Sequence, residues 1–191
     1  MIKLSILVSA LFFLNTYPGA GPSRYEHTPD GPAINWSPDV LLEWSDFKAK
    51  KKSGGGFAVA SSTCGFGFDG IKMDDEISVN VYVRFYCTES WHHKDYNLAE
   101  VLKHEQLHFD ICELYGRIFY KNVLFLRRSG SLNERTIKKV LSELMEEYDQ
   151  TQKRYDDETN HSTNELKQTE WKEKITHALN DFAQYADYKE F

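Results

Sequence analysis

The sequence predicts an α+β domain in which a small antiparallel sheet is followed by three helices. Two patterns carry this prediction. Residues Ile77–Cys87 alternate apolar and polar side chains, which is typical of a half-buried antiparallel strand. After residue 97, apolar residues recur at helical spacing in three successive segments separated by polar breaks. We therefore expect strands in the first half of the chain and helices in the second.

The composition is that of a folded protein of one domain. The chain has 191 residues, of which 41% are hydrophobic and 14% aromatic, so it can bury a real core. Its net charge is −6 and it has no dense basic cluster, so the sequence gives no reason to expect nucleic acid as a partner. The oligomeric state does not follow from the sequence.

The first residues have the pattern of a secretory signal peptide. Lys3 precedes the apolar run Leu4–Leu14, and turn-forming residues follow it. We place the signal peptide at residues 1–20 and expect a secreted or periplasmic protein without a stable membrane span once it is removed. Residues 21–38 contain four prolines and predict an extended leader, so the folded domain is expected at residues 39–191.

Two strands are expected before the helices. Phe57–Phe68 is rich in β-branched, small and aromatic residues, and Asp69-Gly70 resembles a hairpin turn, with Met73–Glu76 as the polar connection to the next strand. Cys64 and Cys87 flank these strands and could form a disulfide in an oxidising compartment. The third cysteine, Cys112, is expected to be a buried thiol.

Capping patterns predict where the three helices begin. Asn97 with Glu100 marks the first helix, in which Gly116 could introduce a kink or an end. The second helix is expected to begin near Ser131. A polar break over Tyr155–Ser162 precedes the third helix, for which Ser162 is the expected cap.

The first helix carries the motif His104-Glu105-Gln106-Leu107-His108. Residues four apart lie on the same face of a helix, so the two imidazoles can bind one cation. This is the H-E-x-x-H arrangement of zinc peptidases, in which the glutamate is the general base that acts on a metal-bound water. The motif predicts a zincin-like helix with Zn²⁺ bound by His104 and His108.

A catalytic zinc needs a third protein ligand and one open position. The candidates are Asp110, Glu113 and the polar group at residues 156–161. Asp110 and Glu113 are turned away from the metal face, and Asp110 is better placed to accept a hydrogen bond from a histidine or a neighbouring loop. His161 is the preferred third ligand, with Asp157 or Glu158 as alternatives.

The remaining histidines and the catalytic roles can also be predicted. His92 and His93 are adjacent, so at most one could face a given metal, and a polar loop is the favoured interpretation. Glu105 is expected to transfer the proton of the water to the leaving amine. Tyr155 is a candidate donor to the oxyanion. The strand Ile77–Cys87 is a candidate edge along which a substrate peptide could bind.

Several stretches resemble a known family. They are LEWSDF at Leu42–Phe47, LKHEQLHFDICELYGR at Leu102–Arg117 and YDDETNH at Tyr155–His161. The chain resembles the bacterial domain-of-unknown-function family 922, described as predicted secreted zinc-dependent proteases. The resemblance implies a metal site with His104, Glu105, His108 and a histidine at the position of His161. The chain differs in having Ser162 where the family motif usually has glycine.

The sequence therefore predicts a secreted zinc metallopeptidase whose substrate is a peptide or protein. A zinc amidase that acts on peptidoglycan would use the same chemistry and is the first alternative. A metal-stabilised envelope binding protein without turnover is the second. Glu105 separates the two classes, because a purely structural metal site needs no general base beside an open position.

Overall fold

The structure is a computed structural model that describes residues 23–50, 58–73 and 76–188. The predicted signal peptide lies outside the described residues. The strands are β1 (Glu26–Thr28), β2 (Gly31–Asn35), β3 (Ala60–Ser61), β4 (Cys64–Met73), β5 (Glu76–Tyr86) and β6 (Trp91–His92). The helices are α1 (Ala99–Arg128), α2 (Glu134–Thr159) and α3 (Glu165–Asp181). This order confirms the predicted α+β class with a small antiparallel sheet followed by three helices.

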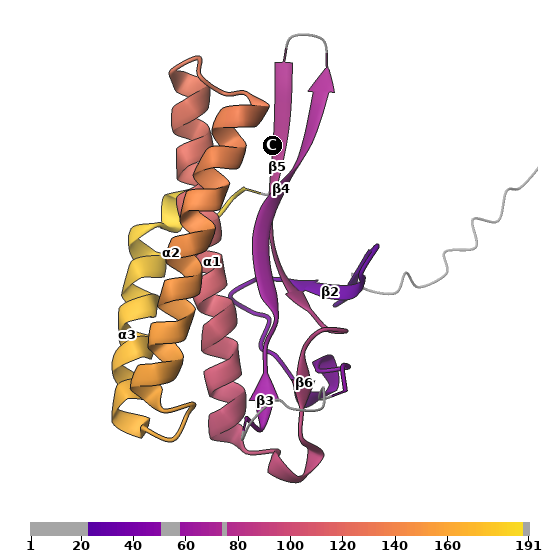
Figure 1. Cartoon of the computed structure of the whole chain (residues 1–191), viewed down its shortest axis with the longest axis vertical. Coiled ribbons are helices and arrows are strands. Elements are labelled where there is room, and N and C mark those ends of the chain that lie inside the picture. The colour runs from indigo at the N-terminus through magenta and orange to yellow at the C-terminus, as the bar shows by residue number, and fades with distance from the viewer. Residues whose placement is uncertain (1–22, 51–57, 74–75, 189–191) are drawn as a thin grey trace, which may run out of the picture.

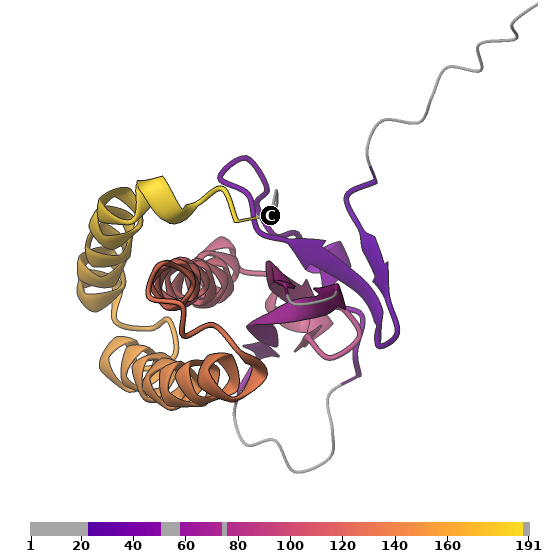
Figure 2. The same cartoon turned by 90° about the horizontal axis from the view of Figure 1, so that it is seen from above.

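Helix α1 is the central element of the fold. It lies between the sheet on one side and the pair α2 and α3 on the other (Figures 1 and 2). The main sheet has the strand order β1-β2-β5-β4, and β3 pairs with β6 in a separate two-stranded sheet. Because α1 contacts both layers, residues on its opposite faces reach different parts of the molecule.

Strand β5 confirms the alternation seen in the sequence. Val79, Val81, Val83 and Phe85 are buried, and they face the core. The predicted turn at Asp69-Gly70 is wrong, because β4 continues through it and pairs with β5 as far as Met73↔Glu76. The long partner strand supplies ladder hydrogen bonds to this stretch, and these outweigh its local preference for a turn.

The expected leader is folded in part. Strand β2 pairs with β5, and Ala33 and Ile34 are buried in that sheet. Arg24, which lies just before β1, binds the buried carboxylate of Asp46, with Nη2 2.6 Å from Oδ2. The prolines of this segment favour an extended backbone, and an extended backbone can pair with β5 as a strand. Proline has no backbone N–H, so the donors of this pairing are the other residues of the segment. The folded part of the chain thus begins before residue 39.

Helix α1 passes Gly116 without a break. A Cβ atom at this position would lie 2.2 Å from Cγ2 of Val83 on β5. Any side chain here would therefore push the helix away from the sheet. The role of Gly116 is close packing of α1 on the sheet rather than the kink or end that the sequence suggested.

The helix caps lie one or two residues later than predicted. The N-cap of α1 is Leu98 rather than Asn97. Asn133 caps α2 in a reciprocal pair with Thr136, and Asn164 caps α3. In both cases an asparagine Oδ1 accepts a backbone N–H, which a serine two residues earlier cannot reach. Helix α2 also runs through most of the predicted polar break, as far as Thr159.

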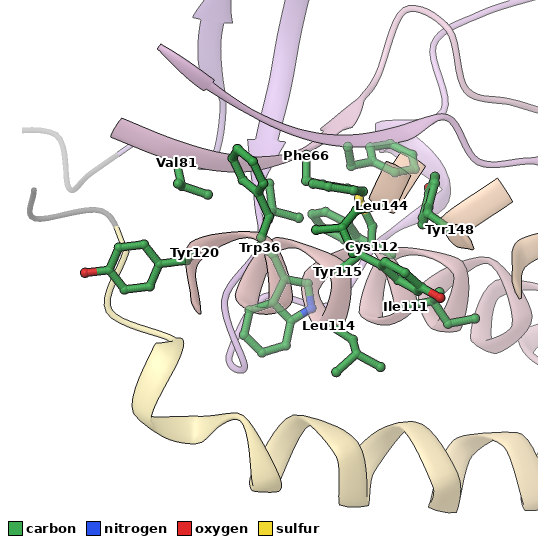
Figure 3. Close-up of a cluster of buried hydrophobic side chains, with 14 of the residues drawn as sticks. Trp36, Phe66, Val81, Ile111, Cys112, Leu114, Tyr115, Tyr120, Leu144 and Tyr148 are labelled. Atoms are coloured by element: carbon green, nitrogen blue, oxygen red, sulfur yellow. The ribbon is translucent and has the colours of Figure 1, made fainter. Parts of the chain in front are cut away.

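The core lies where α1 packs against the sheet and α2. Figure 3 shows its aromatic and aliphatic side chains, among them Phe66 of β4, Tyr115 of α1 and Tyr148 of α2. The ring of Phe66 packs edge-on against that of Tyr148, with centroids 5.6 Å apart. In the part of the chain that the structure describes, no helix combines the length and the apolar character needed to cross a membrane.

Candidate metal centre

The H-E-x-x-H motif lies in the N-terminal half of α1, as predicted. His104 and His108 are on one face of the helix, with ring centroids 4.7 Å apart. His104 is 4% exposed, and the side chain of His108 is 13% exposed. The two histidines of the motif are therefore mostly buried, on a face of α1 that other helices cover.

A third group reaches these histidines from α2. Oδ1 of Asp156 lies 3.1 Å from Nε2 of His104 and 3.1 Å from Nε2 of His108. The two Nε2 atoms are themselves 3.1 Å apart. Three potential ligand atoms thus form a triangle with equal sides. Among the described residues, this is the group of histidine, cysteine and acidic side chains placed to hold a metal ion.

The triangle fits a small divalent cation. Zinc binds histidine nitrogen and carboxylate oxygen at about 2.0–2.2 Å, and three atoms 3.1 Å apart are close enough to bind one such ion together. Two imidazole nitrogens and one carboxylate oxygen are a donor set that zinc uses in catalytic sites. The geometry of the chain's own residues therefore suits the metal that the motif predicts.

Each imidazole has a glutamine on its other nitrogen. Nδ1 of His108 lies 2.7 Å from Oε1 of Gln152, and Nδ1 of His104 lies 3.1 Å from Oε1 of Gln168. Gln152 is on α2 and Gln168 is on α3, so all three helices contribute to the site. These partners hold the rings in the orientation that directs both Nε2 atoms at Asp156.

The charges of the site shift two pKa values in opposite directions. Burial lowers the pKa of His108, but the hydrogen bond to Asp156 and the charges of Glu105 and Asp156 outweigh it, so the pKa is raised. Burial raises the pKa of Asp156, but hydrogen bonds and charge from His104 and His108 bring it well below its usual range. The carboxylate therefore remains ionised, as a metal ligand must.

Glu105 is buried beside the triangle with one oxygen unsatisfied. The residue is 4% exposed, and its Oε2 has no hydrogen-bond partner among the described residues. A buried carboxylate oxygen without a partner is costly, and such atoms in native proteins call for an explanation. Glu105 lines the cavity next to the histidines, where a bound ligand or water could satisfy this oxygen.

The cavity that contains these groups has a volume of about 590 Å³. One wall is formed by the H-E-x-x-H face of α1 and by residues of α2, and the opposite wall is the segment 58–64, which includes β3. Ser62 connects the two walls, because its hydroxyl donates to the carbonyl oxygen of Glu105 at 3.3 Å. A volume of this size can hold several residues of an extended peptide or a small molecule.

The strand beside the cavity is not the one predicted. β5 was expected to be the edge along which a substrate binds, but it lies between β2 and β4 in the main sheet. β4 pairs along almost the whole of one edge, β2 pairs with the other edge at Arg84–Tyr86, and no residue of β5 is among those that line the cavity. The strand that lines the cavity is β3, which pairs with β6 through Ala60↔His92 and Ser61↔Trp91. The sequence predicts Ala60 and Ser61 in one strand with the start of β4, as Phe57–Phe68, whereas the structure separates them from β4.

Tyr155 lies behind the histidines and is not among the residues that line the cavity. It is fully buried, and its ring stacks on that of His104 with centroids 4.6 Å apart. Its hydroxyl donates to the carbonyl oxygen of His104 at 3.2 Å and accepts from Nε2 of Gln168 at 2.5 Å. With these bonds in place, its hydroxyl proton is not directed at a substrate. The structure gives Tyr155 contacts that differ from those of the predicted oxyanion donor.

The predicted third ligand, His161, lies next to the triangle but outside it. Its Nδ1 is 3.4 Å from Oδ1 of Asp156, and its side chain is 69% exposed. The two alternatives are engaged elsewhere, since Asp157 pairs with Lys153 and Glu158 accepts from Nε1 of Trp171. Asp156 belongs to the polar group at 156–161 that the sequence indicated, but it was not one of the three residues preferred there. The assignment of His161 as a ligand stays a prediction.

The loop after α2 has unusual backbone conformations. Asn160, His161 and Ser162 have φ angles of 47°, 49° and 77°. Residues with side chains rarely adopt this left-handed region, whereas glycine adopts it freely. Glycine in place of Ser162 would adopt this φ without steric cost.

Other sequence predictions around the site have clear outcomes. Asp110 accepts from Nε1 of Trp36 at 2.9 Å, which confirms that it holds a neighbouring segment rather than the metal. Cys64 and Cys87 do not form the disulfide that their positions allowed, and all three thiols are free. His92 stacks on Trp44, with centroids 4.7 Å apart, and is not part of the triangle.

Sequence reasoning included Asp156 among its candidates without preferring it, and it missed Gln152 and Gln168 as members of the site. A helical signal was present for two of them, because Gln152 and Asp156 are four residues apart and share one face of α2. That signal was hidden by the assumption that a polar break begins at Tyr155. The pairing of Gln168 with His104 depends on how α3 returns beside α1, which local sequence does not specify.

Fold and site together define an α+β protein with a three-helix layer and a candidate metal centre on its central helix. The family model described as "Bacterial protein of unknown function (DUF922)" matches residues 88–162. The matched stretch includes the H-E-x-x-H motif, Gln152, Asp156 and His161. This part of the chain is therefore similar to that family, as its motifs indicated. No curated protein and no solved structure matches the chain.

Proposed function

We propose that the protein is a zinc-dependent hydrolase that cleaves peptide bonds. The observation that carries this proposal is the triangle of His104 Nε2, His108 Nε2 and Asp156 Oδ1 beside the unpartnered Oε2 of Glu105. A structural zinc site has all of its coordination positions filled by protein ligands. Such a site would not need a buried carboxylate without a hydrogen-bond partner beside it. The zincin-like role of the helix is part of the same proposal.

Asp156 is the third protein ligand in this proposal. Its Oδ1 already lies at the same distance from both imidazole nitrogens, whereas His161 is exposed and reaches only Asp156. His161 then lies at the rim of the site, where it can bind substrate or approach the metal. A bound zinc ion would supply a Lewis acid that polarises a carbonyl group and lowers the pKa of a water molecule.

The chain's own residues perform the proton transfers. Glu105 accepts a proton from the attacking water through its free Oε2 and gives it to the leaving amine. Its burial keeps bulk water from competing for this oxygen. His104 and His108 stay in place because Gln168 and Gln152 hold their rings from behind.

The substrate would lie between α1 and β3. No residue of β5 is among those that line the cavity, whereas β3 pairs with one strand only and does line it. An extended peptide could hydrogen-bond to β3 as an additional strand and so present a carbonyl group to the metal centre. The described cavity wall contains Glu105, Asp149 and Asp156 but no lysine or arginine, which favours peptides with basic side chains.

Metal content and hydrolysis test this proposal on the same purified protein. We expect about one zinc per chain, and cleavage of an unstructured protein substrate such as casein. Replacing Asp156 with alanine should reduce zinc affinity more than His161→Ala, and His161→Ala more than Asp157→Ala. If His161→Ala has the largest effect, the third ligand moves to His161.

The result also separates the alternatives. Zinc binding with cleavage of peptidoglycan but of no peptide substrate would overturn the peptidase proposal in favour of an amidase. Zinc binding without any hydrolysis would favour a metal-stabilised binding protein. A protein that binds no divalent metal would refute all three functions.

We also propose that the protein acts outside the cytoplasm, in the periplasm or the medium. The support is the basic and then apolar pattern of residues 1–20. Cell fractionation tests this, with the full chain compared with a variant that lacks residues 2–20. We expect the full chain outside the cytoplasm and the shortened variant inside it. Retention of the full chain in the cytoplasm would refute the proposal.

A further inference from the structure

Two glutamines occupy equivalent places behind the two histidines of the metal centre. Oε1 of Gln152 faces Nδ1 of His108, and Oε1 of Gln168 faces Nδ1 of His104. An amide oxygen can only accept a hydrogen bond. Each contact therefore requires a proton on Nδ1. A neutral imidazole then keeps its lone pair on Nε2, whereas the imidazolium form that pairs with Asp156 carries a proton on both nitrogens.

The orientation of each amide is determined by its nitrogen. Nε2 of Gln152 donates to the carbonyl oxygen of His108 at 2.9 Å. If this amide were turned over, its oxygen would face that carbonyl oxygen, and two acceptors would meet without a proton between them. The hydrogen bond to the backbone thus directs Oε1 of Gln152 at the ring of His108.

Gln168 is oriented in the same way through Tyr155. Its Nε2 donates to the hydroxyl of Tyr155, and that hydroxyl donates its single proton to the carbonyl oxygen of His104. The tyrosine oxygen can therefore only accept from Gln168, and Oε1 of Gln168 must face the ring of His104. In each case one glutamine connects a histidine ring to the backbone carbonyl of the same histidine.

We propose that Gln152 and Gln168 are positioning residues that hold both histidines in the Nδ1-protonated tautomer. The two Nε2 atoms lie 3.1 Å apart, so a proton on either would occupy the space between them and block a cation. With both protons on Nδ1, both lone pairs and the Asp156 carboxylate point at one place. The glutamines thus prepare the site for a metal before it binds.

The choice of an amide has a further consequence. A carboxylate behind a metal-bound histidine makes the imidazole a stronger donor and adds negative charge to the site. This site already holds Glu105 and Asp156. Neutral glutamines fix the tautomer without that extra charge, so a bound metal remains a strong Lewis acid. This inference rests on the metal centre of the proposed function, but not on peptidase activity.

Methionine variants test the inference, because methionine has nearly the shape of glutamine and no amide. We expect Gln152→Met and Gln168→Met each to weaken zinc affinity about 10–100-fold, measured by competition with a chromogenic chelator. The matched control is Gln106→Met. Gln106 lies in the motif itself, but its Oε1 accepts from the N–H of Leu42 and its Nε2 donates to Oδ1 of Asp110. Neither contact involves the two histidines, so zinc affinity should not change.

Nuclear magnetic resonance of the imidazole nitrogens gives a readout that a general loss of packing would not move. We expect a protected Nδ1–H signal for both histidines in the zinc-loaded protein. Gln152→Met should remove the protection at His108 alone, and Gln168→Met at His104 alone. Gln152→Glu keeps an acceptor and should restore zinc affinity to at least that of the unmodified protein, with a lower kcat if the protein is a hydrolase.

Two results would overturn the inference. One is unchanged zinc affinity in both methionine variants that remain folded by circular dichroism. The other is an Nε2-protonated tautomer for either histidine in the metal-free protein above its pKa. The second measurement needs no metal, so a protein that binds no zinc would refute the proposed function and still decide the tautomers.

Discussion

Helix α1 buries two glutamates, Glu105 near its N-terminal end and Glu113 at its middle, and the two have opposite environments. Glu113 is 1% exposed, and its oxygens accept from Nε of Arg117 at 2.8 Å and from the hydroxyl of Tyr188 at 2.5 Å. Glu105 is 4% exposed, and its Oε2 has no partner among the described residues. Residue type, helix and burial are shared, so the difference lies in what surrounds each carboxylate.

The surroundings separate a structural from a functional carboxylate. The part of α1 from Glu113 onward, called the closed half below, packs against the sheet, and Tyr188 of the C-terminal segment donates a hydrogen bond to Glu113. The part before it, called the open half, contains Glu105 and opens on the cavity. A fully paired buried charge belongs to the fold, whereas a buried oxygen left without a partner beside a cavity is available to a ligand.

The largest expected effect separates the two glutamates by turnover. We expect Glu105→Gln to reduce kcat by about 10²–10⁴-fold, because the general base is removed while the shape of the side chain is kept. Zinc content and thermal stability should be retained. The matched variant Glu113→Gln should lower stability and leave kcat of the folded fraction nearly unchanged. Equal kcat losses in the two variants would remove the distinction.

The next effect tests the closed half by stability. Arg117 is the charged partner of Glu113, and its removal leaves a carboxylate buried without a cation. We expect Arg117→Met to lower the free energy of unfolding by about 3–5 kcal/mol in urea titrations. Lys153→Met, which removes the exposed partner of Asp157, should have little effect. A small loss for Arg117→Met would show that the closed cluster does not stabilise the fold.

In the metal-free protein, the contribution of His108 and Asp156 to stability depends on pH. The pKa of His108 is raised in the folded, metal-free protein, so its contribution to stability is present below the unfolded value near 6.5 and is lost as the pH rises through the raised pKa. The pKa of Asp156 is lowered, so its contribution is present above about 3.9 and is lost as the pH falls. The ion pair therefore helps the metal-free protein most between about pH 4 and 6.5.

Zinc competes with the proton on His108, and its effect follows from the same signs. At a free concentration of 100 times its Kd, zinc should add about 2.7 kcal/mol at pH 8. We expect the increase in Tm on adding zinc to shrink steadily from pH 8 to pH 5. Scanning calorimetry with and without a chelator measures this. An increase that is independent of pH would place the metal away from the histidines.

Close packing in the closed half gives a smaller effect. A Cβ at Gly116 would meet Val83 at 2.2 Å, so we expect Gly116→Ala to lower the free energy of unfolding by about 1–3 kcal/mol. Combining it with Val83→Ala should cost less than the sum of the two single changes, because the shorter side chain makes room. Strict additivity in urea titrations would show that the two residues do not compete for this space.

The smallest effect concerns backbone strain at the open half. Ser162 has a φ of 77°, and glycine adopts this region without steric cost. We expect Ser162→Gly to raise the free energy of unfolding by about 1 kcal/mol, with zinc affinity unchanged. Thermal denaturation of the two proteins provides the comparison. A destabilised Ser162→Gly variant would mean that the serine side chain contributes more than the strain costs.

Much of the fold was predictable because its signals are local. The alternation of Ile77–Cys87 and the helical spacing after residue 97 reflect one buried face in each element, so they identified β5 and the three helices. The turn at Asp69-Gly70, the leader and the helix caps were less accurate. In these places a pairing partner such as β5, or a neighbouring asparagine, decided between conformations that the local sequence left close in free energy.

The sequence by itself determined that His104, Glu105 and His108 share one region of a helix, because residues three and four apart must lie near each other there. Only the tertiary structure decided which groups meet them. Asp156, Gln152 and Gln168 come from 44 to 64 residues further along the chain. Their arrival depends on how α2 and α3 pack beside α1, and packing is a property of whole helix faces rather than of any local motif.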